Sequence, residues 1–197
     1  NGICDEDEIA SQTISLEMGW NLWSSHIDPS PLDCDADASM ASIFSDIVDD
    51  VIIVKDQDGS VYWPGFGLNS IGCIANGYGY LAKMSTANDL IISGSVIPED
   101  YAISLDEGWG IVGYLPLECG DASDMMMPLV DSDILVILKD DLGNVYWPAF
   151  GLNNIGNMCP GEGYQVKTLS TVDFSYPSGG RFGFSDVTPV VKTVYYE

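Results

Sequence analysis

The stretch that decides the fold is VYWPGFGLNSIG at residues 61–72, because residues 145–156 read VYWPAFGLNNIG. The two stretches are identical at ten of twelve positions and lie 84 residues apart. Chance identity is roughly one in twenty per position with ordinary residue usage, so a match of this length indicates an internal duplication. The chain therefore contains two copies of one small unit.

The duplication extends beyond the central stretch. Further matches at the same spacing are VIIVKD (51–56) with LVILKD (135–140), GYGY (77–80) with GEGY (161–164), and Lys83 with Lys167. Upstream, Gly19-Trp20 matches Gly108-Trp109 at a spacing of 89, so the second copy is five residues shorter there. These matches predict four segments: an acidic linker end (1–9), a first module (10–98), a second module (99–177) and an extended C-terminal tail (178–197).

Both copies show the same order of expected elements. Residues 14–25 alternate apolar and polar, which predicts one half-buried strand. Ser39 is placed to cap a short helix, whose apolar side chains then recur at helical spacing. Residues 51–54 and 61–63 flank an Asp-Gly turn, which predicts a β-hairpin.

Two more strands are expected at 80–83 and 89–96. Pro128 interrupts the helical pattern of the second copy, which predicts one shorter, irregular turn there. The predicted fold class is mainly β with one short helix per module, that is, two tandem homologous modules of the small α+β kind.

The charge balance excludes several classes of partner. The 197 residues hold 6 Lys and Arg against 30 Asp and Glu, a formal net charge of −24. Such a surface repels phosphate backbones and anionic lipid head groups, so no nucleic acid and no membrane are expected as partners. At 46% hydrophobic residues the chain is no disordered acidic tail. Four of the six basic residues are lysines matched in the repeat, namely Lys55 with Lys139 and Lys83 with Lys167.

No apolar run approaches the roughly 20 residues that a membrane-spanning helix needs, so no membrane insertion is expected. Residues 1–8 read NGICDEDE and lack the basic and apolar regions of a signal peptide. This start predicts that the chain is a processed protein or a piece of a longer one.

The five cysteines follow the repeat. Cys34 lies within one residue of the position of Cys119, and Cys73 within two residues of that of Cys159. This pattern predicts one disulfide per module, Cys34–Cys73 and Cys119–Cys159, with free buried cysteines as the alternative. Metal ligation is not favoured, because there is no Cys-x-x-Cys and only one histidine. Disulfides indicate an oxidising compartment, so we expect a secreted or cell-surface protein.

Calcium is the one candidate ion, and no other cofactor is expected. In NGICDEDE, residues Asn1, Gly2, Asp5 and Glu8 fit positions 5, 6, 9 and 12 of a calcium-binding loop. The first half of such a loop is missing from this sequence. A solvated acidic linker is the other interpretation of these residues.

The repeated aromatic motif supplies the candidate ligand-binding residues. Neighbouring residues of a strand point to opposite faces, so in each Tyr-Trp pair one ring can be core while the other is exposed. An exposed Trp with Asn nearby suits the apolar face and the hydroxyls of a sugar. The other interpretation is that these residues fix a tight turn and fill a small core. The candidates are Tyr62, Trp63, Phe66, Asn69, Tyr146, Trp147, Phe150 and Asn153.

Enzyme signatures do not occur in the sequence. There is no G-x-S-x-G elbow, no phosphate-binding glycine loop and no Cys–His couple, and His26 has no counterpart in the second copy. We therefore expect a non-enzymatic protein. Duplication of a small module favours binding or scaffolding, because two weak sites reinforce each other.

The motifs GWNLWSSHIDP (19–29), VIIVKDQDGSVYWPGFGLNSIG (51–72) and PGEGYQVK (160–167) resemble a module repeated in large secreted surface proteins of Bacteroidetes. NGICDEDEI resembles the acidic linkers between domains of those proteins. The resemblance implies an extracellular, multidomain parent protein whose other domains or copies are partners.

The function expected from the sequence is that of an extracellular module pair for surface display or adhesion, with carbohydrate as a candidate ligand. One alternative is a structural subunit of an extracellular filament, assembled by exchange of a terminal strand from the tail. A third interpretation is an accessory domain of a larger secreted enzyme.

Overall fold

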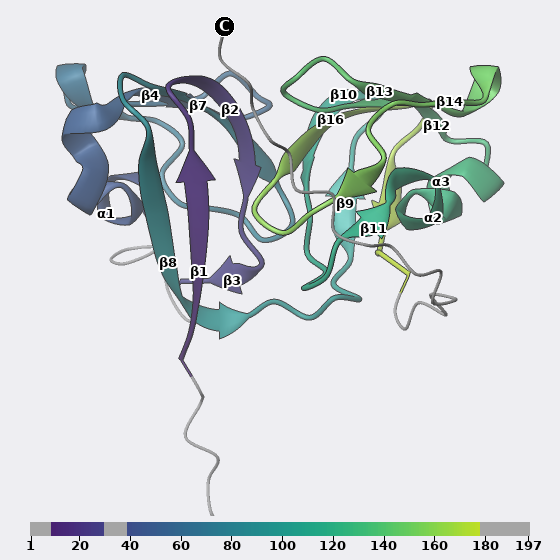
Figure 1. Ribbon diagram of the computed structural model, residues 1–197, viewed down its shortest axis with the longest axis horizontal. Helices are drawn as coiled ribbons and strands as arrows, with labels where there is room; N and C mark the ends of the chain where they lie inside the picture. Colours follow the sequence, from purple (N-terminus) through teal and green to yellow (C-terminus); the bar gives the residue numbers. More distant parts are fainter. Residues whose placement is uncertain (1–8, 30–38, 178–197) are drawn as a thin grey trace, which may run out of the picture.

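The computed structural model describes residues 9–29 and 39–177, and it is mainly β with short helices, as the sequence predicts (Figure 1). The strands of the N-terminal half are β1 (Ala10–Leu16), β2 (Gly19–Ser24), β3 (Ile27–Asp28), β4 (Val51–Lys55), β5 (Val61–Trp63), β6 (Leu68–Asn69), β7 (Gly79–Met84) and β8 (Asn88–Val96). Its helical segments are α1 (Met40–Ile43) and the 3₁₀ helices η1 (Ser45–Asp50) and η2 (Pro64–Phe66).

The C-terminal half has a similar succession of elements. Its strands are β9 (Ile103–Leu105), β10 (Gly108–Gly113), β11 (Gly120–Asp121), β12 (Leu135–Lys139), β13 (Val145–Trp147), β14 (Leu152–Asn153), β15 (Asn157–Met158), β16 (Gly163–Thr168) and β17 (Val172–Phe174). Its helical segments are α2 (Ala122–Met125), α3 (Met127–Asp131) and η3 (Pro148–Phe150).

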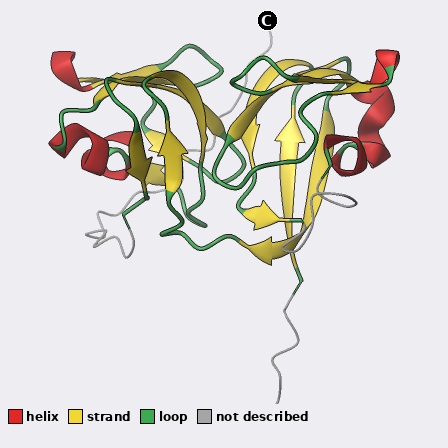
Figure 2. Ribbon diagram, turned by 180° about the vertical axis from the view of Figure 1, so that it is seen from behind, coloured by secondary structure: helices red, strands yellow, loops and turns green. Residues whose placement is uncertain are grey.

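Each half contains a five-stranded antiparallel sheet. The strand orders are β2-β7-β4-β5-β6 and β10-β16-β12-β13-β14, so equivalent strands occupy equivalent places. Both sheets lie along the upper edge of the molecule in Figure 1, and short helices lie at its two outer corners (Figure 2). The hairpin predicted on either side of the Asp-Gly turn is β4–β5, with Val54 opposite Tyr62. The limits of the two modules, residues 10–98 and 99–177, stay a prediction.

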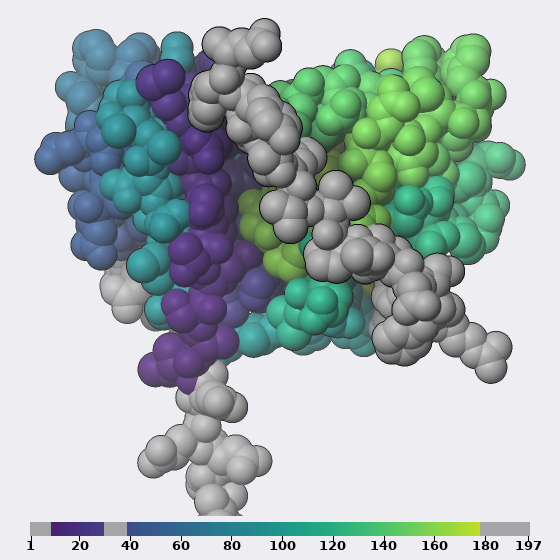
Figure 3. All heavy atoms as spheres, in the orientation of Figure 1, coloured from purple at the N-terminus to yellow at the C-terminus, as the bar shows by residue number. Residues whose placement is uncertain are grey.

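A second layer of strands covers the lower face of each five-stranded sheet. β1 pairs with β8 along its whole length, and the shorter β9 pairs with β17. Figure 3 shows β1 and β8 side by side on the surface of the N-terminal half, in purple and teal. Each half buries its own core between its layers, one around Trp23 and Phe44 and the other around Tyr114 and Tyr164.

The strand predicted over residues 14–25 is wrong in one respect, because two strands occupy this stretch. β1 ends at Leu16 and β2 begins at Gly19. The Asn21 side chain accepts a hydrogen bond from the Glu17 backbone N–H and donates one to the Glu17 carbonyl, both at 2.8 Å. Gly19 has φ +105°, which favours glycine. The chain therefore turns here, and β1 and β2 enter different sheets.

The helix predicted after Ser39 is present, and the Ser39 side chain accepts a hydrogen bond from the Ser42 backbone N–H. The helix is short, because it continues as η1 with a non-helical residue at Ile47. The single irregular turn expected at Pro128 is wrong, since α2 and α3 form there. Pro128 lies in the first turn of α3, where no backbone N–H is needed, so it begins a helix instead of breaking one.

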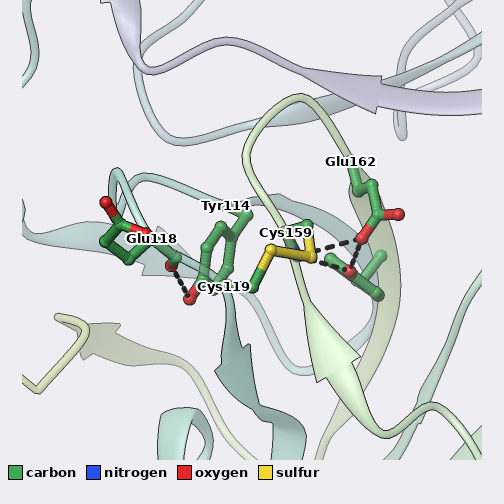
Figure 4. The surroundings of a disulfide bond; sticks show 6 residues. Tyr114, Glu118, Cys119, Cys159 and Glu162 are labelled. Carbon is green, nitrogen blue, oxygen red and sulfur yellow. Dashed lines mark hydrogen bonds between the residues drawn. A yellow bond between two sulfur atoms is a disulfide. The ribbon is translucent and has the colours of Figure 1, made fainter. Parts of the chain in front are cut away.

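The predicted disulfide Cys119–Cys159 is confirmed, and Figure 4 shows its surroundings. It joins the loop before β11 to the end of β15. The Cys159 backbone N–H donates to the Tyr164 hydroxyl at 3.2 Å. Cys73 is also disulfide-bonded, while its predicted partner Cys34 lies outside the described residues. In the described part of the chain, no helix has both the length and the apolar character needed to cross a membrane.

The two halves meet through equivalent contacts. The Ser24 backbone N–H donates to the Gly161 carbonyl at 3.0 Å, and the Gly113 N–H donates to the Gly77 carbonyl at 2.8 Å. Ser24 corresponds to Gly113 and Gly77 to Gly161 in the repeat, so each bond is the counterpart of the other. A Cβ on Gly163 would lie 2.8 Å from the Trp23 carbonyl oxygen, so the close approach of the backbones requires glycine. The junction holds the two five-stranded sheets in a fixed relation.

Candidate functional site

A short 3₁₀ turn shapes the centre of each repeated motif. Pro64 begins η2 with the fixed φ of proline. Gly67 ends it at φ +61°, and its N–H donates to the Pro64 carbonyl at 3.0 Å. Trp63 and Phe66 are three residues apart, and a 3₁₀ helix places such side chains above one another. The sequence Trp-Pro-x-Phe-Gly therefore brings two aromatic rings together.

The two rings of each motif form an exposed corner. The centroids of Trp63 and Phe66 are 4.5 Å apart with an interplanar angle of 65°, and Trp147 and Phe150 repeat this at 4.5 Å and 67°. Trp63 is 38% exposed and Phe66 75%; the counterparts are 37% and 72% exposed. Aromatic side chains usually bury most of their surface. An exposed aromatic pair at the same place in both halves is therefore a candidate ligand-binding surface.

Tyr62 and Tyr146, also predicted at the site, lie in the cores instead. Both are buried, and burial raises the pKa of each phenol. The alternation of Tyr and Trp across the sheet is therefore as the sequence predicts, with the tyrosine inside. Of the four predicted residues in each motif, the Trp and the Phe are the ones placed to contact a ligand.

Asn69 and Asn153 brace the loop that follows the turn. The Asn69 side chain accepts from the Gly72 N–H at 3.0 Å and donates to the Gly72 carbonyl at 3.2 Å. The Asn153 side chain accepts from the Gly156 N–H at 3.1 Å and donates to an Asp121 carboxylate oxygen at 3.1 Å. Their amides are thus used within the protein.

A second tryptophan of each sheet, which the sequence patterns did not single out as a candidate, is also exposed. Trp20 is 46% exposed, and the Nζ atoms of Lys55 and Lys83 lie 5.4 and 5.6 Å from its ring centroid. Trp109 repeats the arrangement with Lys139 and Lys167 at 4.8 and 5.8 Å. The signal that could have found them is the repeat itself, which matches both tryptophans and all four lysines.

These side chains share one face of each five-stranded sheet. Strand pairing places Trp20 opposite Lys83, Lys83 opposite Ile53, and Trp63 opposite Leu68. The register of β4 and β5, continued by one residue, places Ile53 beside Trp63. We call this surface the aromatic face; its residues are Trp20, Lys55, Lys83, Trp63, Phe66 and Leu68 in one half, and Trp109, Lys139, Lys167, Trp147, Phe150 and Leu152 in the other.

The aromatic face is identical in the two halves, whereas other exposed apolar positions differ. Leu142 and Leu169 are 82% and 62% exposed, and their counterparts in the N-terminal half are Asp58 and Ser85. Folding requirements explain identity at buried positions and at turns. They do not explain why exposed aromatic and lysine side chains are the same in both copies.

A cleft of about 720 Å³ lies where the two halves meet. It is lined by β1 and β2 on one side and by residues 140–144 and 154–164 on the other. Its polar groups are largely satisfied by the protein: the Asp140 carboxylate accepts from the Asn144 N–H at 2.7 Å, and the Asp141 carboxylate accepts from the Leu22 N–H. We regard this cleft as part of the junction.

Several predicted features lie outside the described residues. They are the calcium candidates Asn1, Asp5 and Glu8, the cysteine Cys34, and the tail at 178–197 on which filament assembly depends. These interpretations stay predictions.

Comparison with known proteins adds no relative. No protein-family model, no curated protein and no solved structure matches this chain. The resemblance to surface proteins of Bacteroidetes therefore stays a prediction, and the function is argued from the site alone.

Proposed function

We propose that the chain is a non-enzymatic, extracellular pair of modules for surface display or adhesion, and that it binds carbohydrate through its two aromatic faces. The observation that carries this proposal is the pair of exposed aromatic corners, Trp63 with Phe66 and Trp147 with Phe150, at equivalent places in the two halves.

The chemistry of the corner suits a sugar ring. The C–H groups of a pyranose form an apolar face that packs on an indole ring, and the electron-rich face of the indole attracts their partial positive charge. Phe66 stands at a steep angle beside Trp63, so the corner offers a second apolar wall. One such contact is weak. Two copies held in a fixed relation strengthen binding to a polymer through effective concentration.

The disulfides support an extracellular setting, because such bonds persist mainly in oxidising compartments. Cys119–Cys159 and the disulfide at Cys73 lie in equivalent parts of the two halves. They are compatible with display on a cell surface.

Affinity electrophoresis against a panel of neutral and acidic polysaccharides tests the proposal. We expect retardation by at least one polysaccharide, and we expect Trp63→Ala with Trp147→Ala to abolish it. The matched control is Leu142→Ala with Leu169→Ala, which removes exposed apolar side chains outside the aromatic face and should leave retardation unchanged.

Two results would contradict the proposal: no retardation by any polysaccharide, or retardation that survives the loss of both tryptophans. Concentration-dependent assembly, measured in parallel by sedimentation, would favour the filament subunit if it occurs without any carbohydrate binding. Truncation at Ser178 further separates the carbohydrate-binding module pair from the filament subunit. A truncated protein that stays folded but no longer assembles would support assembly by exchange of a strand from the tail.

A further inference from the structure

We propose that the carbohydrate bound by the aromatic face is acidic, with sulfate or carboxylate groups that are bound by the lysines beside Trp20 and Trp109. This inference rests on the proposed function and names the class of its ligand. The observation behind it is the arrangement of two ammonium groups around one exposed indole, present once in each half.

Within the part of the chain that the structure describes, the four lysines of the aromatic faces contact tryptophan rings and not carboxylates. The chain has five times as many acidic as basic residues, so a carboxylate is the commonest charged neighbour available to a lysine. Across residues 9–29 and 39–177, none of the four lies within ion-pair distance of a carboxylate, and each is held against a tryptophan ring. A cation over an aromatic face keeps its charge unneutralised. These ammonium groups are therefore free to bind an anion.

The lysines of the described residues all lie on the two aromatic faces. Lys55, Lys83 and their counterparts Lys139 and Lys167 are four of the six basic residues, and all four lie on the aromatic face. Across residues 9–29 and 39–177 there is no other Lys or Arg, so the remaining described surface carries acidic side chains and repels anions. An acidic ligand is thus attracted to this face and to few other places, and this local charge complementarity gives orientation and specificity.

The acidic side chain of Asp56 lies near the C-terminal site. Asp56 borders a hollow of about 200 Å³ beside Trp109. Its carboxylate already accepts hydrogen bonds from the backbone N–H groups of Asp58 and Ser60, at 2.9 and 2.8 Å. Since two N–H dipoles offset its charge, Asp56 disfavours an anion less than an unpaired carboxylate would.

The spacing of the groups fits a sugar chain better than a small anion. In the N-terminal half Trp20, Lys83, Ile53 and Trp63 follow one another across four strands, and neighbouring strands are about 4.8 Å apart. The row has an indole at each end, Trp20 and Trp63, and the lysine ammonium groups lie near Trp20. Such a row matches consecutive sugar rings of a chain, of which the ring at Trp20 carries the anionic group. Because the site is duplicated, a polymer with a repeating anionic unit can engage both copies.

The test compares polysaccharides that differ only in charge. The probes are sulfated polysaccharides with their desulfated forms, and uronic-acid polysaccharides with their carboxyl-reduced forms. We expect at least one acidic form to bind about tenfold more tightly than its neutral counterpart, as two exposed ion pairs per half would give. Tighter binding of the sulfated polysaccharides would identify sulfate as the anionic group, and tighter binding of the uronic-acid polysaccharides would identify carboxylate.

Lysine variants test whether the difference in affinity between the acidic and the neutral polysaccharide comes from the lysines. Replacing all four by Gln (Lys55, Lys83, Lys139 and Lys167) should reduce binding of the acidic form to that of the neutral form or below it, whereas replacing all four by Arg should preserve it. The control is Lys192→Gln, which removes one positive charge at a lysine outside the repeat. Thermal unfolding of each variant checks that the fold is retained.

The possible failures are distinguishable. Equal binding of charged and neutral forms, or tight binding by the Gln variant, overturns this inference and leaves the proposed function standing. Binding of neither form, in every series, overturns both. Retention of acidic binding after loss of Trp63 and Trp147 would contradict the proposed function and leave an anion site at the lysines alone.

Discussion

Ser24 and Gly113 face each other where the two halves meet, and only one of them has a side chain. They are equivalent in the repeat, and a Cβ on Gly113 would lie 2.8 Å from the Cβ of Ser24. The Ser24 hydroxyl donates to the Glu162 carbonyl at 2.5 Å and accepts from the Tyr114 N–H at 3.0 Å. The duplicated chain could not keep serine in both copies, because there is room for one side chain at this contact.

The contact between Ser24 and Gly113 predicts how substitutions at these two positions change the stability of the protein. Gly113→Ala should cost about 1–3 kcal/mol of unfolding free energy, because the added methyl group also lies 2.8 Å from the Tyr78 carbonyl oxygen. The double variant Ser24→Gly with Gly113→Ala should recover the part of the loss that comes from contact with the Ser24 Cβ, whereas the part that comes from the Tyr78 carbonyl should remain. A double-mutant cycle by urea unfolding measures the coupling. Strictly additive losses would contradict the idea of one shared space.

Much of the local structure could be predicted from the sequence, because it depends on neighbouring residues. The Asp-Gly hairpin, the helix cap at Ser39 and the burial of one ring of the pair Tyr62 and Trp63 follow from turn chemistry and alternation, whereas which ring is buried does not. The disulfide Cys119–Cys159 followed from a comparison of the two copies. These signals lie within a few residues or within the repeat itself.

The rest depends on contacts that no local pattern records. The break between β1 and β2 comes from the Asn21 side chain and from the pairing of the two strands with different partners. The site at Trp20 needs β2, β7 and β4 to be neighbours in a given register before Lys83 and Lys55 can reach the ring. The sequence showed that the lysines are repeated, and only the sheet order shows what they surround.

The environment of Asp141 at the junction predicts that the stability of the fold depends on pH. Burial, with a smaller contribution from the neighbouring Asp140 charge, raises the pKa of the Asp141 carboxyl above its usual value. The folded state therefore holds this proton more tightly than the unfolded state, so the stability that Asp141 contributes is present at low pH and is lost as pH rises through the folded pKa. Asp141→Asn should raise the midpoint of thermal unfolding at pH 7 and leave it unchanged at pH 3.

The equivalent residue in the first copy is already an amide, which provides the control. The Gln57 side chain accepts from the Ile111 N–H at 3.0 Å, as the Asp141 carboxylate accepts from the Leu22 N–H. Gln57→Glu should do the reverse of Asp141→Asn and destabilise the protein at pH 7. A lower midpoint for Asp141→Asn at pH 7 would show that the charge, not the hydrogen bond, is what the junction needs.

The disulfide predicts a loss of stability on its removal. Cys119 and Cys159 are 40 residues apart, and closing a loop of that length restricts the unfolded chain by about 4 kcal/mol at 25 °C. Cys119→Ala with Cys159→Ala should lower the free energy of unfolding by roughly that amount, measured with urea. The same urea curve for the variant with and without reductant separates this bond from the one at Cys73. A loss below about 1 kcal/mol would mean that the reduced unfolded chain is already restricted.

The duplicated site predicts a difference between long and short ligands. On a polysaccharide that spans both aromatic faces, Trp63→Ala alone should weaken binding more than tenfold, because the loss of one site removes the gain from effective concentration. On an oligosaccharide too short to reach both faces, the same variant should halve the number of sites and leave the affinity of the remaining one unchanged. Isothermal titration with both ligands measures stoichiometry and affinity. Equal effects on the two ligands would indicate that the sites act separately.

Salt should affect the binding of an acidic polysaccharide in an unusual way. For a basic protein such binding weakens steadily as salt rises. This protein carries a net charge of −24, so at low ionic strength the polymer is repelled by the molecule as a whole while only four lysines attract it at contact. The Debye length shortens from about 30 Å at 0.01 M to about 8 Å at 0.15 M, which screens the distant carboxylates before it weakens contacts of a few ångströms.

We therefore expect affinity for the acidic polysaccharide to rise between 10 mM and about 200 mM NaCl and to fall again towards 1 M, where contact pairs are screened as well. The neutral counterpart should bind equally at all three concentrations, since its contacts are apolar and hydrogen-bonded. Replacing the four lysines by Gln should remove the fall at high salt, because that part of the curve reports the ammonium–anion contacts. A steady decrease from the lowest salt onward would show that attraction at the aromatic face outweighs the acidity of the whole surface even when neither is screened.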